Sequence, residues 1–322
     1  MSMKAIVVRE LGGPEVLRLE EVARPHPGPG EVVLRVHASG VNFSDTERRR
    51  GVYLAVDLPW IPGGEAAGVV VGVGEGVDED LLGRRVAALG SATYAELMIA
   101  QAEALIPLPD EVSFEQGAAF PIQGLTAYHT VLTLGRVRPG ATVLVHAAAG
   151  GVGLLAIQIA RRAGARVLGT VSSAAKAALV IEAGADEALA YGPDLAGMVR
   201  ERTGGHGVDL VLDSVGLATQ AASLAMLAPF GHLVHFGSAS GSPAPVDPED
   251  LYERSLTVSA YWLRTAHPRE LMRRAVGDLL GWIVDGSLRL PISRVLPLAE
   301  AAEAHRALEA RETHGKLLLA VP

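Results

Sequence analysis

The sequence predicts an α/β protein in which a β-rich half is interrupted by a doubly wound parallel-sheet domain. Short apolar runs separated by Gly/Pro turns fill residues 3 to about 100, and strand-like and helix-like segments alternate from about residue 113 onward. A strand-like run near the end of the chain fits a β-rich half that resumes after the insertion. At 322 residues, the chain is long enough for about two domains of roughly 150 residues each.

The first part is expected to consist of short β-strands. Residues 25–30, Pro-His-Pro-Gly-Pro-Gly, must form a loop, because proline fixes its φ angle and lacks an amide hydrogen. A short helix is expected over 45–50. The expected strands cover residues 4–9, 16–22, 31–38, 67–73, 85–89 and 94–99.

The second part is expected to alternate strands with helices. Ser113 and Gln116 have the spacing of a capping box, and helical periodicity follows through Val131. The alternation that comes next predicts parallel βαβ units. The expected strands are 142–146, 166–171, 188–191, 208–213, 232–236 and 257–261, and the expected helices are 153–163, 174–183, 195–203 and 219–227. Helices over 268–285 and about 299–310 should precede a last strand over 316–321.

Composition excludes several classes of function. A net charge of −8 argues against nucleic acid and anionic membranes as partners. The absence of cysteine removes disulfides, thiolate nucleophiles, iron–sulfur clusters and cysteine-based zinc sites. The N-terminal residues lack the pattern of a signal peptide. The uncharged stretch 139–160 contains four glycines, a histidine and a glutamine, which fits a strand turning into a helix better than a membrane span. We therefore expect a cytoplasmic protein.

Asparagine occurs once in the chain, at Asn42, and arginine supplies 25 of the 28 basic residues. Depletion of thermolabile residues is a mark of proteins from hot environments, and codon bias in a GC-rich genome explains the same composition. Both explanations stay open. In a chain that avoids asparagine, Asn42 is a position of interest.

The strongest local motif is residues 143–155, in which an apolar strand ends in a Gly-rich turn that opens a helix. This is the context of a dinucleotide-binding fingerprint. Gly150 lets the backbone approach a pyrophosphate, Gly153 permits close packing of helix on strand, and the helix N-terminus favours negative charge. Ala148 stands where the fingerprint has its first glycine.

The end of the next strand indicates which dinucleotide is bound. An NAD site carries an Asp or Glu about 20 residues after the glycines, and this chain has none there. Ser172, Ser173 and Lys176 follow the strand instead, and hydroxyls with an ammonium suit a 2′-phosphate. The alternative for Lys176 is an exposed position on an ordinary helix.

Several segments, taken in order, resemble one family. They are 40–45 (GVNFSD), 63–70 (GGEAAGVV), 124–128 (GLTAY), 147–153 (AAAGGVG), 169–176 (GTVSSAAK) and 313–316 (THGK). Together they resemble the medium-chain dehydrogenase/reductase superfamily, in its zinc-free NADPH:quinone oxidoreductase (zeta-crystallin-like) branch. The resemblance implies a GroES-like catalytic domain over 1–122 and 266–322, a Rossmann domain over 123–265, NADPH in the cleft between them, and a homodimer.

The resemblance also bears on zinc. Zinc alcohol dehydrogenases of this superfamily have a Cys at the position of Asn42 and a His at that of Gly64, and their third ligand corresponds roughly to Gln123. Only Glu65 remains, and catalytic zinc needs about three protein ligands. We therefore expect no metal.

The resemblance places Asn42, Asp45 and Tyr53 near the nicotinamide and the substrate. Asn42 has an amide donor and Tyr53 a phenol donor, whereas the alternatives are a surface aromatic for Tyr53 and a helix cap for Asp45. Residues expected to hold the cofactor are Gln123, Thr126, Ala149, Gly150, Gly151, Val152, Gly153, Ser172, Ser173, Lys176, Tyr191, Phe236, Gly237, Ser238 and Arg311.

The function expected from these observations is reduction of quinones by NADPH through direct hydride or electron transfer without a metal. Two alternatives remain open. One is an NADPH-dependent enone or 2-alkenal reductase, which would use the same hydride donor. The other is a non-catalytic NADPH-binding protein with a structural or redox-sensing role.

Overall fold

The computed structural model describes residues 2–242, 245–265 and 267–322, and their contacts form two compact units. The first comprises residues 1–122 and 280–322, and the second comprises residues 123–279. In the sequence-based division, the second segment of the catalytic domain begins at Ala266, which lies outside the described residues. In the division by contacts, that segment begins at Leu280, inside helix α9 (Arg269–Val284). The boundaries of the functional domains stay a prediction.

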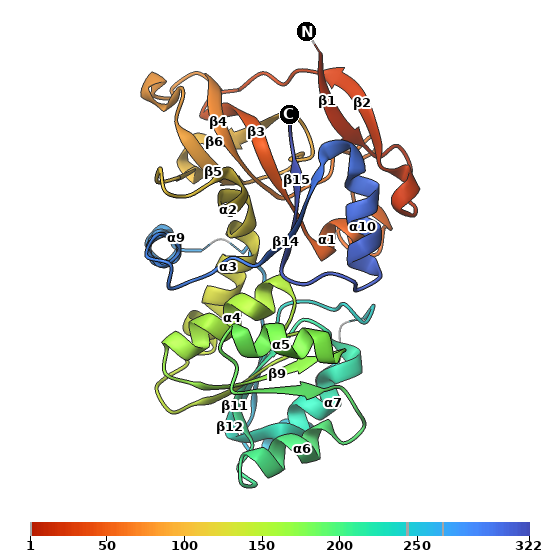
Figure 1. The fold of residues 1–322 in the computed structure, drawn as a ribbon, viewed down its shortest axis with the longest axis vertical. Coiled ribbons are helices and arrows are strands. Elements are labelled where there is room, and N and C mark those ends of the chain that lie inside the picture. Colours follow the sequence, from red (N-terminus) through yellow and green to blue (C-terminus); the bar gives the residue numbers. More distant parts are fainter. Residues whose placement is uncertain (1, 243–244, 266) are drawn as a thin grey trace. The chain divides into compact units, whose positions relative to one another are not determined.

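The first unit is built on a seven-stranded sheet, counted over the described residues, with the order β14-β15-β3-β4-β5-β7 and with β6 paired to β3. All of its pairings are antiparallel except that of β14 with β15. A separate hairpin joins β1 and β2 (Figure 1). The strands are β1 (Ser2–Val7), β2 (Arg18–Ala23), β3 (Glu31–Val41), β4 (Glu65–Val73), β5 (Arg85–Leu89), β6 (Leu97–Gln101), β7 (Ile106–Pro107), β14 (Ile292–Pro297) and β15 (Lys316–Ala320).

Pairing of β15 with β3 brings the end of the chain to the first helix. In that register Leu317 lies opposite Val41, so Lys316 and Asn42 are the next residues at the same end of the two strands. Asn42 then leads directly into α1. The helices of this unit are α1 (Phe43–Arg49), α2 (Phe114–Ala119) and α10 (Ala301–Glu309), with 3₁₀ turns η1 (Pro14–Val16), η2 (Glu79–Leu81), η3 (Ala102–Ala104) and η5 (Leu298–Glu300).

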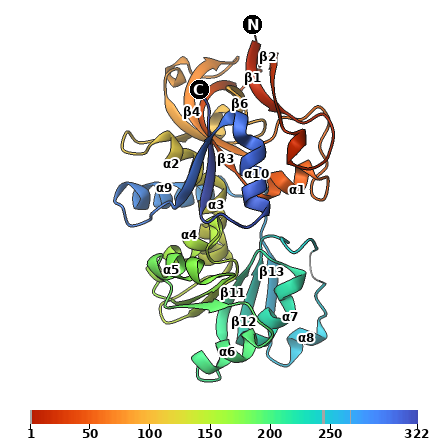
Figure 2. The ribbon, with the colours of Figure 1, turned by 45° about the vertical axis from the view of Figure 1, so that its right-hand side comes forward.

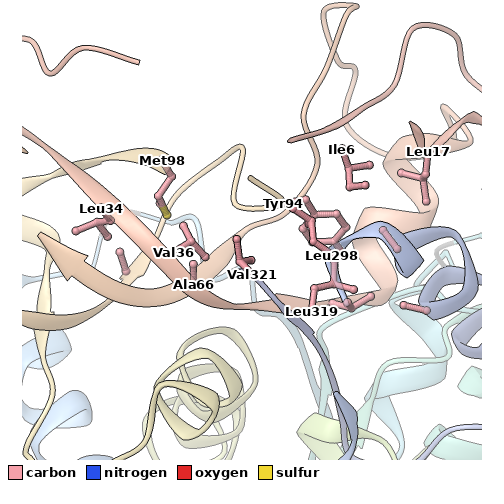
Figure 3. Packing of buried hydrophobic residues seen from close by; sticks show 14 of the residues in the cluster. Ile6, Leu17, Leu34, Val36, Ala66, Tyr94, Met98, Leu298, Leu319 and Val321 are labelled. Carbon is pink, nitrogen blue, oxygen red and sulfur yellow. The ribbon is translucent and has the colours of Figure 1, made fainter. Parts of the chain in front are cut away.

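One face of this sheet and helix α10 share an apolar core. Figure 3 shows the ring of Tyr94 lying among aliphatic side chains that include Ile6 and Leu298. Tyr94 and Ile6 are at most 1% exposed. The core thus surrounds the tyrosine ring with apolar atoms, and its hydroxyl requires a polar partner.

The second unit contains a six-stranded sheet in the order β10-β9-β8-β11-β12-β13, with every neighbouring pair parallel. The strand order reverses between β8 and β11, which is where open α/β sheets bind ligands. In Figure 2, α4 and α5 lie on one side of this sheet and α7 on the other. The strands are β8 (Thr142–Val145), β9 (Arg166–Val171), β10 (Glu187–Ala190), β11 (Val208–Asp213), β12 (Leu227–His235) and β13 (Thr257–Ala260). The helices that lie wholly or mostly in this unit are α3 (Pro121–Tyr128), the π-helical η4 (His129–Leu134), α4 (Gly151–Arg162), α5 (Ala174–Glu182), α6 (Leu195–Arg202), α7 (Leu217–Met226), α8 (Glu249–Tyr252) and α9.

The predicted fold class is confirmed, and the structure differs from the expected elements at several places. The helix expected to continue from residue 113 through Val131 is divided into α2, α3 and a π-helical segment, with the first break at Phe120. Pro121 has no amide hydrogen to continue the helix that precedes it. Strand β14 was not expected. Within the described residues, no helix has both the length and the apolar character needed to cross a membrane.

Candidate active site

Asn42 lies in a buried polar cluster of the first unit. Its side-chain Oδ1 accepts a hydrogen bond from Lys316 Nζ at 2.8 Å, and its Nδ2 donates to Glu65 Oε1 at 2.9 Å. Lys316 also forms an ion pair with Glu65. An amide side chain between an ammonium and a carboxylate can take only one orientation. One of the two Nδ2 hydrogens therefore stays available for a substrate or cofactor oxygen, since the described residues give it no second acceptor.

Glu65 is completely buried at the start of β4, and each of its carboxylate oxygens has a partner. Oε1 faces Lys316 and Asn42, while Oε2 accepts the backbone N–H of Ile122 at 2.7 Å. A side chain on Gly40 would meet this carboxylate at 2.5 Å. The glycine of the segment 40–45 therefore leaves the space that Glu65 occupies.

Asp45 lies in the first turn of α1, and its Oδ2 accepts the backbone N–H of Asn42 at 3.0 Å. It thus serves the helix-entry role that was the alternative to a catalytic one. Burial raises the pKa of this carboxyl to about 6, against the lowering effect of the Asn42 N–H. The carboxyl of Asp45 therefore titrates near pH 6.

Tyr53 follows α1 in a turn segment, and its side chain is 42% exposed. The structure brings Asn42 and Asp45 together but does not include Tyr53 in their hydrogen-bonded cluster. Its expected catalytic role stays a prediction.

The Gly-rich turn lies between β8 and α4 in the second unit, as the sequence predicts. Gly150 is the N-cap of α4, and Gly151, Val152 and Gly153 form its first turn. A Cβ on Gly153 would lie 2.6 Å from the carbonyl oxygen of Ala148, so this position needs glycine for the helix to approach the strand. The N–H groups at the start of α4 are the donors that a pyrophosphate requires.

Gln123 and Thr126 lie on α3, and Gln123 packs against the same turn. A Cβ on Gly151 would clash with the amide of Gln123, so glycine at this position allows the amide to lie there. Thr126 is 7% exposed. Ala149, the remaining predicted residue of the turn, is buried beside Gly150. The structure thus brings Gln123 to the fingerprint, whereas Thr126 is placed one helical turn further along α3.

Ser172 and Ser173 follow β9 and lead into α5. Ser173 is the N-cap of α5, and its Oγ accepts the backbone N–H of Lys176 at 3.4 Å. Both serines are exposed. Lys176 stands in the first turn of the helix, so the two serines and the lysine lie together at one helix start. Arg311 is an exposed residue of the first unit that follows α10 and has a φ of 58°.

Tyr191 contributes to the Gly-rich turn in a way that the sequence did not indicate. Its hydroxyl oxygen accepts the backbone N–H of Ala147 at 2.8 Å, and its ring stacks on His146 with 5.8 Å between ring centres. Ala147 has a φ of 47°, which is uncommon for a residue other than glycine. Tyr191 therefore stabilises the strained residue that begins the turn.

Phe236, Gly237 and Ser238 follow β12 at the carboxyl end of the sheet. The Phe236 N–H donates to the carbonyl oxygen of Asp213 at 2.9 Å. A Cβ on Gly237 would lie 3.0 Å from the carbonyl oxygen of Ser214. This segment therefore packs against the loop after β11, at the edge of the sheet where ligands bind in such folds.

The residues at the positions of a catalytic zinc site do not fit zinc. Asn42 and Glu65 are committed to Lys316, and Gly64 has no side chain. Across the residues that the structure describes, no three His, Cys, Asp or Glu side chains gather as a metal site. The expectation of a metal-free reaction stays a prediction.

Comparison with known proteins identifies the family. Residues 28–110 match the family model described as alcohol dehydrogenase GroES-like domain, and residues 151–279 match the one described as zinc-binding dehydrogenase. The quinone oxidoreductase of Pseudomonas aeruginosa is 41% identical over 98% of this chain and 99% of that protein. The chain belongs to the medium-chain dehydrogenase/reductase superfamily, in its zeta-crystallin-like quinone oxidoreductase branch.

Other relatives and solved structures of this superfamily agree. Quinone oxidoreductase 1 of Escherichia coli is 39% identical over 96% of each chain. The crystal structure of Escherichia coli quinone oxidoreductase complexed with NADPH matches with a TM-score of 0.94 at 38% identity, covering 98% of this chain and 99% of that one. A mycobacterial protein complexed with NADPH matches with a TM-score of 0.94 at 42% identity, covering 99% of this chain and all of that one.

Sequence reasoning did not assign a role to Lys316, Tyr94, His305 or Arg49, all of which are buried close to Asn42 or Asp45. For Lys316 a signal existed: it lies in the segment 313–316 and is one of only three lysines in the chain. Tyr94 and His305 carried none, because partners 211 residues apart leave no local pattern.

Proposed function

We propose that this chain reduces quinones with NADPH and that no bound metal takes part in the step. The Gly-rich turn at the start of α4 carries this proposal, in a chain that matches named quinone oxidoreductases over nearly its full length. NADPH supplies a hydride when bound. The chain's own residues then bind and orient the reactants and offer a hydrogen-bond donor to the oxygen that gains charge.

The pyrophosphate would be held by the N–H groups at Gly151–Gly153, above a helix start whose dipole favours negative charge. Lys176, with Ser172 and Ser173 beside it, would receive the 2′-phosphate, together with Arg311. The remaining predicted residues Gln123, Thr126, Ala149, Gly150, Tyr191, Phe236, Gly237 and Ser238 complete the proposed cofactor site.

Asn42 is the proposed donor to the substrate oxygen. Lys316 and Glu65 hold its amide in one orientation, so the second Nδ2 hydrogen is oriented before the substrate binds. A donor that needs no reorganisation stabilises developing negative charge most effectively. Asp45 holds the backbone of Asn42, and Tyr53 is proposed as a second donor from the turn segment after α1.

A second candidate is reduction of an activated alkene. A relative from Burkholderia named 2-haloacrylate reductase is 37% identical over 98% of this chain and of that protein. An enone or 2-alkenal would use the same hydride donor and would place its carbonyl oxygen at the same amide of Asn42.

The deciding experiment follows NADPH absorbance with a panel of ortho- and para-quinones, enones, 2-alkenals and 2-haloacrylate. Oxidation of NADPH that depends on quinone, and that persists after treatment with EDTA, supports the proposal. Preference for the alkenes would support the second candidate. Loss of activity with EDTA, together with stoichiometric zinc by elemental analysis, would contradict the metal-free reaction. NADPH binding without turnover of any acceptor would leave a non-catalytic role.

We further propose a cytoplasmic homodimer. Strand β13 is an edge of the six-stranded sheet, and two such edges can pair across a two-fold axis. Light scattering at micromolar concentration is expected to give twice the chain mass. A thermophilic source would be supported by a midpoint of thermal unfolding well above that of ordinary mesophilic domains, roughly 45–65 °C.

A further inference from the structure

A series of buried hydrogen bonds leads through His305 and Tyr94 to the oxygen of Asp45 that also accepts the Asn42 N–H. Tyr94 Oη donates to Asp45 Oδ2 at 3.3 Å, and Tyr94 Oη lies 3.2 Å from His305 Nε2. His305 Nδ1 lies 3.2 Å from Arg49 Nη1. The four side chains are between 0 and 3% exposed, so water does not compete for these bonds.

The guanidinium of Arg49 fixes the donor-to-acceptor direction of these hydrogen bonds. Arginine has donors only, so Nδ1 of His305 must accept and its one hydrogen must be on Nε2. His305 then donates to Tyr94, and Tyr94 must give its single hydroxyl hydrogen to Asp45. Burial and the charge of Arg49 lower the pKa of His305 to about 3, which keeps this tautomer uncharged. Every donor therefore points toward Asp45.

Arg49 is in turn held at the far end. Its Nη2 donates to Glu309 Oε1 at 2.6 Å and its Nε to the carbonyl oxygen of Gly12 at 3.0 Å. A guanidinium has donors only, so it offers no site that could accept a proton from His305. The series of hydrogen bonds therefore ends at a fixed charge. It orients the groups it joins and does not conduct protons to the surface.

We propose that Tyr94 and His305 are positioning residues that act through Asp45 to hold Asn42 in the geometry its donor role requires. The inference rests on the proposed function of Asn42. Asp45 accepts both the Tyr94 hydroxyl and the Asn42 N–H on the same oxygen, while Lys316 and Glu65 hold the Asn42 side chain. Backbone and side chain of Asn42 are thus each fixed by a separate buried group.

Removing the Tyr94 hydroxyl has a defined electrostatic result at Asp45. The groups acting on this carboxyl are the Asn42 N–H, Lys316 and Tyr94, which lower its pKa, and Glu65, which raises it together with burial. Tyr94→Phe removes one bond to the charged form, so the pKa must rise further. A hydrogen bond to a charged group corresponds to a shift of about one to two pKa units, and the length of this bond, 3.3 Å, places the expected increase at the lower end of that range.

The composition of the chain allows a direct test. Selective ¹⁵N labelling of asparagine gives one backbone amide and one side-chain amide, both from Asn42, because no other asparagine exists. In the full-length protein, the Asn42 backbone signal is expected to titrate near pH 6. The midpoint should rise by about one unit in Tyr94→Phe, which removes the bond to Asp45, and by less in His305→Leu, which keeps the Tyr94 hydroxyl but removes the group that orients it. His305→Gln should restore it, because a glutamine amide can accept from Arg49 and donate to Tyr94.

Tyr128→Phe is the matched control, since the Tyr128 hydroxyl also donates to a carboxylate, that of Asp278, at 2.6 Å. It should leave the Asn42 titration unchanged. With quinone as acceptor, Tyr94→Phe should lower kcat about tenfold at neutral pH and move the acidic limb of the kcat profile upward, without changing the Kd for NADPH. An Asn42 midpoint that does not move in Tyr94→Phe would overturn the inference. If the midpoint moves but the wild type reduces no quinone, the proposed function fails and the positioning chain stands.

Discussion

Lys316 and Glu65 form an ion pair in which the two side chains are only 2% and 0% exposed. The partners come from β15 and β4, which lie on either side of β3 in the same sheet. Two opposite charges in such a site depend on each other, because either one alone would be buried without compensation.

We therefore expect Lys316→Met to lower the free energy of unfolding by about 3–5 kcal/mol, since Glu65 would keep a buried charge with no cation beside it. Urea denaturation measures the loss. Adding Glu65→Gln should recover much of it, because glutamine removes the charge and still accepts the N–H of Ile122. Lys4→Met, at an exposed lysine, is the control. A loss below about 1 kcal/mol for Lys316→Met would show that the pair contributes little.

Asn42→Ala is expected to lower quinone turnover on the order of a hundredfold, with little change in the affinity for NADPH. The loss of one oriented donor to a developing oxyanion has this size. Steady-state kinetics and fluorescence titration separate the two effects. Gln101→Ala removes an exposed amide of the same unit and should leave turnover unchanged. Near-normal turnover in Asn42→Ala would reduce this residue to a helix-entry role.

Gly153→Val should abolish NADPH binding and leave a folded protein. Its Cβ would lie 2.6 Å from the carbonyl oxygen of Ala148, so the start of α4 must move away from the turn. Gly277→Val is the matched control, because it places the same side chain on a helical glycine with open space around it. Calorimetric titration with NADPH should show binding in the control only. Equal affinities in both variants would mean that the phosphates are bound elsewhere.

The affinity for NADPH should exceed that for NADH at least about tenfold. Two charge-assisted contacts to the 2′-phosphate would supply this difference, even after their strength is reduced for exposure to solvent. The double variant Lys176→Ala, Arg311→Ala should weaken NADPH binding far more than NADH binding, and the difference should shrink as salt rises. Lys4→Ala controls for the loss of a positive charge. A double variant that keeps its preference for NADPH would exclude these side chains as the receptors of the 2′-phosphate.

Stability is expected to fall as the pH drops from 7 to 5. Burial lowers the pKa values of His129, His146 and His305 to about 4, 4 and 3, whereas unfolded histidines titrate near 6.5. Their contribution is therefore fully present above pH 6.5 and is lost as the pH falls, by about 1.4 kcal/mol per pH unit for each. Asp45, whose pKa is raised, acts in the opposite direction between about 6 and 3.8.

Urea denaturation at several pH values measures this slope. His305→Gln should reduce the loss between pH 7 and 5 by about one third of the combined contribution of His129, His146 and His305, since one of these three groups is removed. A slope equal to that of the wild type would show that His305 takes up its proton equally in both states.

Local patterns predicted most of the fold. The Gly-rich turn, the alternation of strands with helices and the absence of an acid after β9 all occur within short stretches of sequence. Lys316 and Glu65, by contrast, are 251 residues apart, and nothing near either residue indicates the other. The same holds for Tyr94 and His305. Pairing of β15 with β3 creates these neighbours, and that pairing is a property of the assembled sheet.

The first unit is made from both ends of the chain, and this sets an order for biosynthesis. Residues 123–279 form a compact unit from one continuous segment, so they can fold while the ribosome is still adding the rest. Strand β15 must leave the ribosome before the sheet around β3 is complete and before the buried carboxylate of Glu65 meets its cation. The second unit can thus fold first, and the proposed catalytic amide of Asn42 acquires its fixed orientation only after Lys316 has left the ribosome and joined the sheet.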